Sequence, residues 1–337
     1  MTNVLFTSAG RRGYLLDWFR ESNFFGQVFA INSEPCTAFA DADAWRVIPT
    51  TIDESYRSAL WSAIEEWSIG LVIPLTDVDS LVLSSLREEF LRRGVTFFGS
   101  EEAKTRFMVD KSTWTSALAE AGFPVPKTFR TLVEAQDCLA SGEVSFPLCV
   151  KPGFGTSARL VQKVGSLLEL EDTYGTFEKT PFTDLEKLCG VEPSRRFIIQ
   201  EVVEGIEIGV DLLADFSGRY EGALFREKRH SRGGETDQAK VRRSLDVGFS
   251  LESLAQHLGF AGLIDLDLVL DGDGRGVILD INPRIGGGYP FSHLAGANLP
   301  TYARAWIEGR RAEILPEQFT ESLYGKVVQV IEIPLPD

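Results

Sequence analysis

Short apolar runs alternate with amphipathic stretches along the first hundred residues. The runs at 4–7, 28–31, 71–73 and 95–98 have the length of buried strands, and a shorter candidate lies at 47–48. The stretches 14–21, 56–67 and 78–93 have the apolar period of a helix that covers one side of a sheet. This β-α-β order predicts a parallel sheet with helices on its faces.

Polar loops follow three of these strands, at residues 8–13, 32–34 and 76–79. Ligands of parallel sheets bind at the carboxyl ends of the strands, so these loops are candidate substrate contacts. Arg11 and Arg12 in the first loop have the charge to grip a carboxylate or a phosphate, although a surface turn explains the loop equally well. The loop lacks the GxGxxG spacing of a dinucleotide site.

The pattern changes twice further along the chain. Between 110 and 203, helices are expected at about 109–122, 132–140 and 166–177, and strands at 127–130, 148–151, 158–161 and 197–201. From 204 onwards, strands predominate at 207–214, 220–228, 261–270, 276–282 and 325–333, with helices at 249–258 and 300–308. We expect three domains, at 1–109, 110–203 and 204–337, because a chain of 337 residues can bury more than one core.

Acidic and amide side chains recur at every second position on two neighbouring strands. Asp265 and Asp267 alternate on the first strand, and Asp280, Asn282 and Arg284 alternate at the end of the second. Side chains two positions apart share a face, so pairing of the strands predicts a cluster of carboxylates with an amide oxygen. Such a cluster needs a cation, and hard oxygen ligands suit magnesium with nucleotide phosphates as its further ligands. A solvated hairpin explains the acidic turn between the strands but not the Asp-Ile-Asn-Pro-Arg run.

A lysine stands where an apolar strand meets a glycine loop. Lys151 is followed by Pro-Gly-Phe-Gly and then by Thr156 and Ser157. A lysine, backbone N–H groups and hydroxyls in such a loop can hold phosphate oxygens. The GxxxxGK[ST] order of a P-loop is absent, and taken alone the segment is also typical of a hairpin.

The segment 200–207 ends another strand with exposed backbone groups and carboxylates. The region of Glu201 and Val203 could meet an adenine edge, and Glu207 could meet ribose hydroxyls. Taken alone, this pattern is more typical of a plain interdomain linker.

Two further segments are candidates for substrate contact. Gly286, Gly287 and Gly288 follow Arg284, and their N–H groups could cradle an oxyanion or an acyl phosphate; a flexible turn is the alternative. Residues 226–236 are basic and broken by glycine, so we expect a loop there, in which Lys228 and Arg229 suit phosphate or an anionic substrate unless the loop is merely solvated. The histidine at 293 fits either the core or the site.

The charge of the chain restricts its partners. The formal net charge is −15, and such an acidic surface repels nucleic acid and anionic membranes. No apolar run approaches the roughly 20 residues of a membrane span, and the first residues lack a charged-then-apolar signal. The four cysteines form no CxxC pair and no zinc spacing. We expect a reduced, cytoplasmic protein that binds neither nucleic acid nor membrane.

The order of these signals resembles the ATP-grasp superfamily, over nearly the whole chain. Lys151 and its glycine loop come first, the 200–207 segment second, and the Asp-Ile-Asn-Pro-Arg strand last. The resemblance implies an ATP-grasp fold of mixed α/β and α+β class, with an amino-terminal parallel-sheet domain of the pre-ATP-grasp, Rossmann-like type. It also implies that ATP and Mg²⁺ (or Mn²⁺) bind between a lid and a larger domain.

The resemblance gives each candidate residue a role. Lys111 and Lys151 are similar to residues that contact the nucleotide phosphates, Ser157 lies in the matching lid loop, and Arg284 is similar to an arginine that steadies the transferred phosphoryl group. The adenine hinge corresponds to Glu201 and Val203, the ribose acid to Glu207, and the magnesium ligands to Asp267, Asp280 and Asn282. The family more often has Glu where Asp280 stands, so we expect the shorter side chain to shift the metal.

The details look similar to the large subunit of carbamoyl phosphate synthase and its stand-alone relatives. The segments 4–12, 73–74, 110–111 and 290–300 carry that similarity. The chain is too short for the two synthetase halves of that enzyme, so carbamoyl phosphate synthesis is not expected. The resemblance implies an ADP-forming ligase that couples a carboxylate to an amine, and a homodimer. A bicarbonate-activating enzyme and a non-catalytic nucleotide-binding module are the alternatives.

Overall fold

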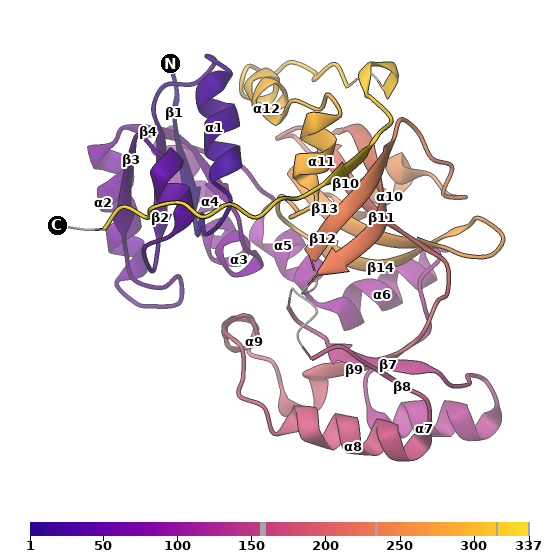
Figure 1. Cartoon of the computed structure of the whole chain (residues 1–337). Helices are drawn as coiled ribbons and strands as arrows, with labels where there is room; N and C mark the ends of the chain where they lie inside the picture. The colour runs from indigo at the N-terminus through magenta and orange to yellow at the C-terminus, as the bar shows by residue number, and fades with distance from the viewer. Residues whose placement is uncertain (156–159, 233–234, 315, 336–337) are drawn as a thin grey trace.

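Three β-sheets organise the computed structural model of the chain, which describes residues 1–155, 160–232, 235–314 and 316–335. The sheets have five, four and six strands, and each is made from its own part of the chain. Figure 1 shows the five-stranded unit on the left, the six-stranded unit on the upper right and the four-stranded unit below.

The amino-terminal unit is a parallel sheet with the strand order β3-β2-β1-β4-β5. Its strands are β1 (Asn3–Thr7), β2 (Val28–Asn32), β3 (Ala44–Val47), β4 (Ile69–Pro74) and β5 (Thr96–Phe97). The helices are α1 (Gly13–Glu21), α2 (Tyr56–Glu66), α3 (Asp77–Ser85) and α4 (Arg87–Arg92), with a short 3-10 turn at Thr37–Asp41. Successive β1 residues point into cores on opposite faces of the sheet, as expected for strands covered on both sides.

Two details of this unit differ from the sequence-based expectation. The helix expected at 78–93 ends at Ser85 and restarts at Arg87, since Leu86 leaves helical geometry at the junction. The strand expected at 47–48 occupies Ala44–Val47 instead, where its partly buried positions pair with β2.

The second unit is an antiparallel sheet with the order β6-β9-β7-β8. Its strands are β6 (Thr128–Phe129), β7 (Leu148–Pro152), β8 (Gln162–Val164) and β9 (Phe197–Glu201). Helices α7 (Leu132–Ser141) and α8 (Leu167–Glu178) cover it, and α5 (Glu102–Val109) and α6 (Lys111–Glu120) precede it. The strand expected at 158–161 lies largely outside the described residues, and the observed β8 begins just after it.

The third unit is an antiparallel sheet with the order β14-β13-β10-β11-β12-β15. Its strands are β10 (Ile206–Ala214), β11 (Tyr220–Arg232), β12 (Glu235–Arg242), β13 (Gly262–Leu270), β14 (Gly276–Asn282) and β15 (Leu323–Gly325). The helices are α10 (Leu251–Leu258), α11 (Tyr289–Leu294) and α12 (Leu299–Ile307). One face of the sheet packs its apolar residues against α6 and α10.

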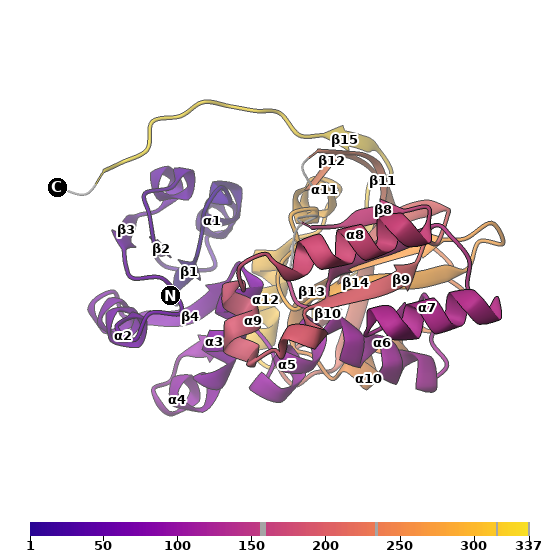
Figure 2. The ribbon, with the colours of Figure 1, turned by 90° about the horizontal axis from the view of Figure 1, so that it is seen from below.

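Two expectations for this unit were wrong. The described residues of the basic run expected as a loop at 226–236 lie in strands: β11 continues to Arg232 and β12 begins at Glu235. The two strands pair from Phe225 opposite Arg242 to Arg232 opposite Glu235. The terminal strand expected at 325–333 ends at Gly325. Figures 1 and 2 together show the chain after β15 running outward, apart from the five-stranded sheet.

A short helix joins the second unit to the first. Helix α9 (Asp184–Cys189) was not expected from the sequence, and its Leu185 packs against Leu81 of α3 in a small apolar cluster. The buried Arg196 holds this helix, because its Nε donates to Glu186 Oε1 at 2.9 Å and its other nitrogens donate to carbonyls between Glu178 and Pro181. The four-stranded unit therefore contacts the amino-terminal unit through the apolar packing of α9 on α3, besides the chain connection, and the Arg196–Glu186 ion pair holds α9 within its own unit.

The interface between the first and third units contains His293. Its ring stacks on Trp18 of α1 with centroids 3.6 Å apart, and burial lowers the pKa of His293 to about 4. A pKa below the unfolded value of 6.5 means that unfolding takes up a proton between about pH 6.5 and 4. This contribution to stability is present above pH 6.5 and is lost as the pH falls towards 4.

We expect His293→Gln to reduce the loss of stability between pH 7 and pH 5, because glutamine does not titrate. Urea unfolding midpoints of both proteins at the two pH values test this. An equal change of midpoint in both would contradict the assignment.

Within the described residues, the helices are all too short or too polar to cross a bilayer.

Candidate active site

A cleft of about 640 Å³ lies where the three units meet. It is lined from the amino-terminal unit by Leu75–Asp77 and Arg12, and from the second unit by Lys151 and Gly155. Strands β10, β11, β13 and β14 of the six-stranded sheet supply most of the remaining lining. The convergence of all three units makes this cleft the candidate active site.

The acidic strands pair as their alternation predicts. In the antiparallel register of β13 and β14, Asp265 lies opposite Asn282, and Asp267 lies opposite Asp280. All four side chains line the cleft. The prediction that pairing brings these oxygen-bearing side chains together is therefore confirmed, and Asp265 belongs to the group as fully as Asp267.

Two lysines from outside the hairpin reach its carboxylates. Lys111, at the start of α6, donates to Asp280 Oδ1. Lys151, on β7, donates to the carbonyl of Leu279 at 3.2 Å, and burial lowers its pKa to about 8. Burial alone would raise the pKa of Asp280, but the two ammonium groups outweigh it and hold that pKa below its ordinary value. The lysines face the strand from which the carboxylates project.

Arg284 is fixed by carboxylates from two units. Its Nε donates to Asp77 Oδ2 at 3.2 Å, and its Nη1 lies 3.6 Å from Asp265 Oδ2. Asp77 is buried at the start of α3, and its Oδ1 has no hydrogen-bond partner among the described residues. The sequence reasoning marked the loop 76–79 but missed Asp77 as the partner of the arginine. Because the two residues are 207 positions apart, only the fold reveals the pair.

A second arginine organises the wall of the cleft. Arg226 donates to Asp211 Oδ2, to Ser292 Oγ at 3.0 Å and to Asp265 Oδ1 at 3.0 Å. Asp211 is fully buried, and burial raises its pKa to about 6 in spite of the arginine. Arg226 therefore links β10, β13 and α11, and it positions the Asp265 carboxylate.

The glycine loop fits closely around this network. A Cβ on Gly286 would lie 2.3 Å from the carboxyl carbon of Asp265, and one on Gly288 would lie 2.7 Å from Nε of Arg226. Real Cβ contacts essentially never come this close, so any side chain at either position must displace its neighbour. The small residues are required for the approach of the loop to β13.

We expect Gly286→Ala to lower the rate of any reaction in the cleft by at least about tenfold, because displacement of a catalytic group by about 1 Å can lower a reaction rate on the order of 10²-fold. Overpacking should also reduce the free energy of unfolding by about 1–3 kcal/mol. Gly272→Ala is the matched control, since that hairpin glycine faces open space. Steady-state rates and urea unfolding measure both effects; a variant that keeps full activity would refute the close packing.

The structure brings most of the predicted site residues together. Those that line the cleft are Arg12, Lys111, Lys151, Glu207, Lys228, Asp267, Asp280, Asn282, Arg284, Gly287 and Gly288. Gly286 lies behind them against Asp265. Lys228 Nζ lies 2.7 Å from Asp267 Oδ1, and Arg12 donates to the carbonyls of Leu75 and Ile285.

Other predicted residues lie away from the lining, and one lies outside the described residues. Arg11 is exposed and pairs with Glu235, and Arg229 pairs with Glu227 at the outer end of β11. Glu201 ends β9, and neither it nor Val203 lines the cleft. Ser157 is the residue that falls outside the described ranges.

Charges of opposite sign balance in the cleft. Six cationic and six anionic side chains are found among its described lining residues. The cations are Arg12, Lys111, Lys151, Arg226, Lys228 and Arg284, and the anions are Asp77, Glu207, Glu235, Asp265, Asp267 and Asp280. The cleft is thus nearly neutral within a chain of net charge −15.

The donor set suits a partly coordinated metal. Among the described residues, no three His, Cys, Asp or Glu side chains are arranged to enclose a metal ion. Magnesium does not need such a cage, because it commonly binds through one or two carboxylates and completes its shell with phosphates and water. The carboxylates of Asp265, Asp267 and Asp280 with the amide oxygen of Asn282 fit that mode of binding.

Two family models match parts of the chain. Residues 193–330 match the family described as ATP-grasp in the biosynthetic pathway with Ter operon, and residues 4–98 match the PylC-like N-terminal domain. Among curated proteins, the carbamoyl phosphate synthase large chain of Streptomyces griseus subsp. griseus is 24% identical over 286 residues, which cover 80% of this chain and 24% of the relative. The chain spans about a quarter of the length of such relatives.

Solved structures share the fold. The biotin carboxylase domain dimer of Hydrogenobacter thermophilus 2-oxoglutarate carboxylase, in complex with MgADP, ADP and bicarbonate, superposes with a TM-score of 0.71 at 16% identity, covering 95% of this chain and 72% of that one. L-amino acid ligase from Bacillus licheniformis superposes with a TM-score of 0.68 at 18% identity, covering 91% and 75%. The fold of the chain is therefore the ATP-grasp fold, as the resemblance implied.

Proposed function

We propose that this chain, whose residues 193–330 match an ATP-grasp family and whose residues 4–98 match the PylC-like N-terminal domain, is an ADP-forming ligase that phosphorylates a carboxylate and couples it to an amine. The observation that supports this most is the arrangement around β13 and β14. An arginine, two lysines and a row of oxygen ligands face one cleft, and phosphoryl transfer needs these groups to neutralise and position phosphates.

The nucleotide would bind between the four-stranded and six-stranded units. Lys111 and Lys151 would hold its phosphates, and Glu207, at the cleft rim, would accept from the ribose hydroxyls. We keep Glu201 and Val203 as the adenine hinge, since they connect β9 to β10 at the border of the two units. We propose three domains, 1–109, 110–203 and 204–337, each of which contains one of the three sheets.

The oxygen ligands would hold magnesium. Asp265, Asp267, Asp280 and Asn282 supply hard donors, of which Asp280 and Asn282 stand closest to Arg284 in the sequence. When bound, the metal supplies charge neutralisation on the phosphate oxygens. Lys111 and Lys228 now pair with Asp280 and Asp267, so both lysines would exchange a carboxylate for a phosphate or substrate oxygen when the nucleotide arrives.

The chemistry would proceed in two displacements. A carboxylate oxygen attacks the γ-phosphorus, the bond to the bridging oxygen breaks, and ADP leaves with the electron pair. The amine then attacks the acyl carbon, phosphate leaves with the electrons of the C–O bond, and the amine loses a proton. Arg284 would stabilise the transferred group in both steps, and the N–H groups near Gly287 and Gly288 would face the developing oxyanion.

The acceptor side of the cleft would hold the carboxylate substrate. Arg12 and Lys228 supply positive charge, and both line the cleft; Arg12 lies beside Arg284, since both donate to the carbonyl of Ile285. Arg11 and Arg229 are exposed on its outskirts, so we propose no direct contact for them. A homodimer is a further proposal, supported by the dimer named for one structural neighbour, and a cytoplasmic location stays a prediction.

Activation of bicarbonate is the second candidate. It is supported by similarity to carbamoyl phosphate synthase large chains and to a biotin carboxylase domain solved with bicarbonate. In that case bicarbonate would take the place of the organic carboxylate. A module without catalysis would bind ATP and release no ADP with any acceptor.

The deciding experiment measures ADP and AMP formed from Mg-ATP with pooled amino acids, other carboxylates, bicarbonate and amines. Acceptor-dependent ADP is expected, and splitting the pools would identify the acid. Formation of AMP would refute acyl phosphate chemistry. ADP that depends on bicarbonate alone would favour the second candidate.

A further inference from the structure

A second cavity, of about 180 Å³, lies at the carboxyl edge of the five-stranded sheet. It forms where β1 and β4 lie side by side although the chain visits β2 and β3 between them. Crevices at such reversals of strand order are the usual ligand sites of parallel sheets. Thr76 lines both this cavity and the active-site cleft, so the two spaces adjoin.

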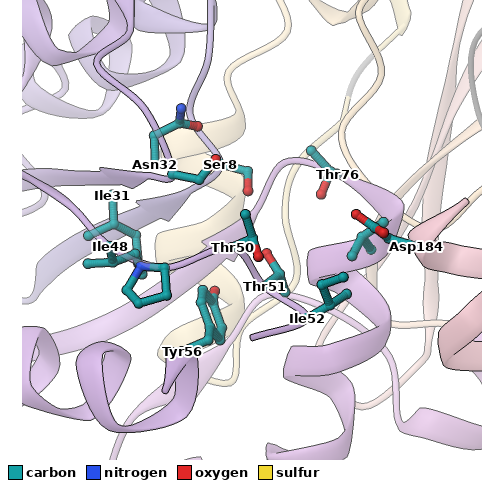
Figure 3. Close-up of a pocket in the computed structure, with 13 residues that line it drawn as sticks. Ser8, Ile31, Asn32, Ile48, Thr50, Thr51, Ile52, Tyr56, Thr76 and Asp184 are labelled. Atoms are coloured by element: carbon teal, nitrogen blue, oxygen red, sulfur yellow. The ribbon is translucent and has the colours of Figure 1, made fainter. Parts of the chain in front are cut away.

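Hydroxyl groups converge on this cavity. Figure 3 shows Ser8, Thr50, Thr51 and Tyr56 pointing toward a common space, with Thr76 at its border. Tyr56 is 4% exposed, and its hydroxyl has no hydrogen-bond partner among the described residues. A buried hydroxyl without a partner costs about 1–3 kcal/mol, which a ligand that bonds to it would offset.

A buried carboxylate supports the floor of the cavity. Asp79 is fully buried beneath Thr51 and accepts hydrogen bonds from Thr51 Oγ1 at 2.5 Å and Thr7 Oγ1 at 2.7 Å. Of these two hydroxyls only that of Thr51 lines the cavity. Since its hydrogen points to Asp79, the lone pairs of the Thr51 oxygen can accept from another donor. The floor therefore presents hydrogen-bond acceptors backed by an acidic group.

The lining also selects the charge of its ligand. Asp184, the first residue of α9, faces the hydroxyl groups from the opposite side, as Figure 3 shows. None of the described lining residues is Lys or Arg. Lys187 does not line the cavity, and its Nζ pairs with Asp184 Oδ1 at 3.2 Å, so a carboxylate or phosphate would have to take this lysine from Asp184. Ile31, Ile48 and Ile52 supply apolar walls for an alkyl part.

We propose that this cavity binds a small aliphatic primary amine, with its ammonium group toward Tyr56, Thr51 and Asp184 and its alkyl part against the isoleucines. Assignment of that amine as the acceptor of the ligase reaction rests on the proposed function, whereas binding itself does not. A ligand here would lie beside Thr76, the neighbour of the Asp77 that holds Arg284. It would also contact α9 through Asp184, the one described lining residue from the four-stranded unit.

The test compares n-butylamine, n-butanol and butyrate, which share one chain length and differ in the head group. Saturation-transfer NMR on the full chain without nucleotide, at pH 7, measures the Kd of each. We expect butylamine to bind most tightly.

Tyr56→Phe should weaken the binding of butylamine by about three- to tenfold, since one hydrogen bond is lost. Asp184→Asn, an exposed change, should weaken it by about two- to fivefold. Asp172→Asn, on the exposed face of α8, is the matched control and should leave binding unchanged.

Preferred binding of butanol or butyrate, absence of binding by all three, or amine binding insensitive to both variants would each overturn the proposal. Failure of the ligase reaction is distinguishable. If no acceptor yields ADP but butylamine still binds in a Tyr56-dependent way, the amine site in the cavity is supported and the proposed ligase reaction is refuted. If ADP forms with an amine acceptor, Tyr56→Phe must raise the KM of that amine and leave the KM of ATP unchanged; an unchanged amine KM overturns the cavity assignment.

Discussion

Replacement of Arg284 by alanine should reduce acceptor-dependent ADP formation by about 10³-fold or more, with a much smaller change in ATP affinity. An arginine that meets charge developing on a transferred phosphoryl group contributes on the order of 10³–10⁵ in kcat. Arg284 lies in the cleft and is held by Asp77 and Asp265, so its guanidinium is already oriented before substrates bind. Steady-state kinetics and nucleotide titration of the same preparation measure the two effects.

The control for this prediction lies on the same hairpin. Arg275 is exposed in the turn between β13 and β14 and pairs with turn carboxylates, so Arg275→Ala should keep full activity. Asp77→Asn leaves Arg284 in place but removes its buried carboxylate partner, and we expect an intermediate loss. If Arg284→Ala retained more than about a tenth of the wild-type rate, it would lack the transition-state role that such arginines have.

Loss of Arg226 should affect stability more than any other single cleft substitution. Arg226→Ala leaves Asp211 fully buried without its cation, and breaking such a pair costs about 3–5 kcal/mol. Burial already raises the pKa of Asp211 to about 6, which shows how poorly the site tolerates an unpaired carboxylate. Urea unfolding should show a lower midpoint with an unchanged slope.

Two variants separate the charge from the packing at this position. Asp211→Asn keeps the shape, leaves Arg226 paired with Asp265, and should cost less than Arg226→Ala. The double variant Arg226→Met with Asp211→Asn removes both charges of this pair and should recover part of the loss, because Asp211 no longer leaves a buried unpaired carboxylate and Asp265 keeps Arg284 as a cation. A double variant less stable than either single one would contradict a desolvation origin.

The elements of this fold were predictable where local pattern decides them. Strands β1 and β4 read as apolar runs because both of their faces are buried, and the order of strands and helices then implied a parallel sheet. The clustering of Asp265, Asp267, Asp280 and Asn282 followed from alternation on two strands joined by a short turn, whereas the register that places Asp265 opposite Asn282 comes from the structure. Such contacts are close in sequence, so period and spacing were enough.

Contacts between distant segments were not predictable in the same way. The pair of Asp77 with Arg284 and the network of Arg226 with Asp211 join residues on different elements, which no local pattern relates. The basic run at 226–236 was expected to be a loop because it is basic and broken by glycine, yet β11 continues to Arg232. The backbone of β11 stays paired with β12 to the end of the strand, although the side chains of its last four residues are exposed. The prediction from local sequence failed there because pairing with the neighbouring strands fixed the backbone conformation.

The balance of charges in the cleft also governs how a nucleotide finds it. The positive and negative charges of the cleft cancel, so the electrostatic potential of the cleft is small beyond a Debye length. The rest of the surface is acidic and repels an incoming polyphosphate. Added salt screens that repulsion, so the association rate constant should rise with ionic strength. Basic phosphate-binding sites show the opposite trend. Binding of the nucleotide would depend on the exchange of ion-pair partners once the nucleotide has reached the cleft. The dissociation rate constant, not long-range electrostatic attraction, would determine which anions the cleft prefers.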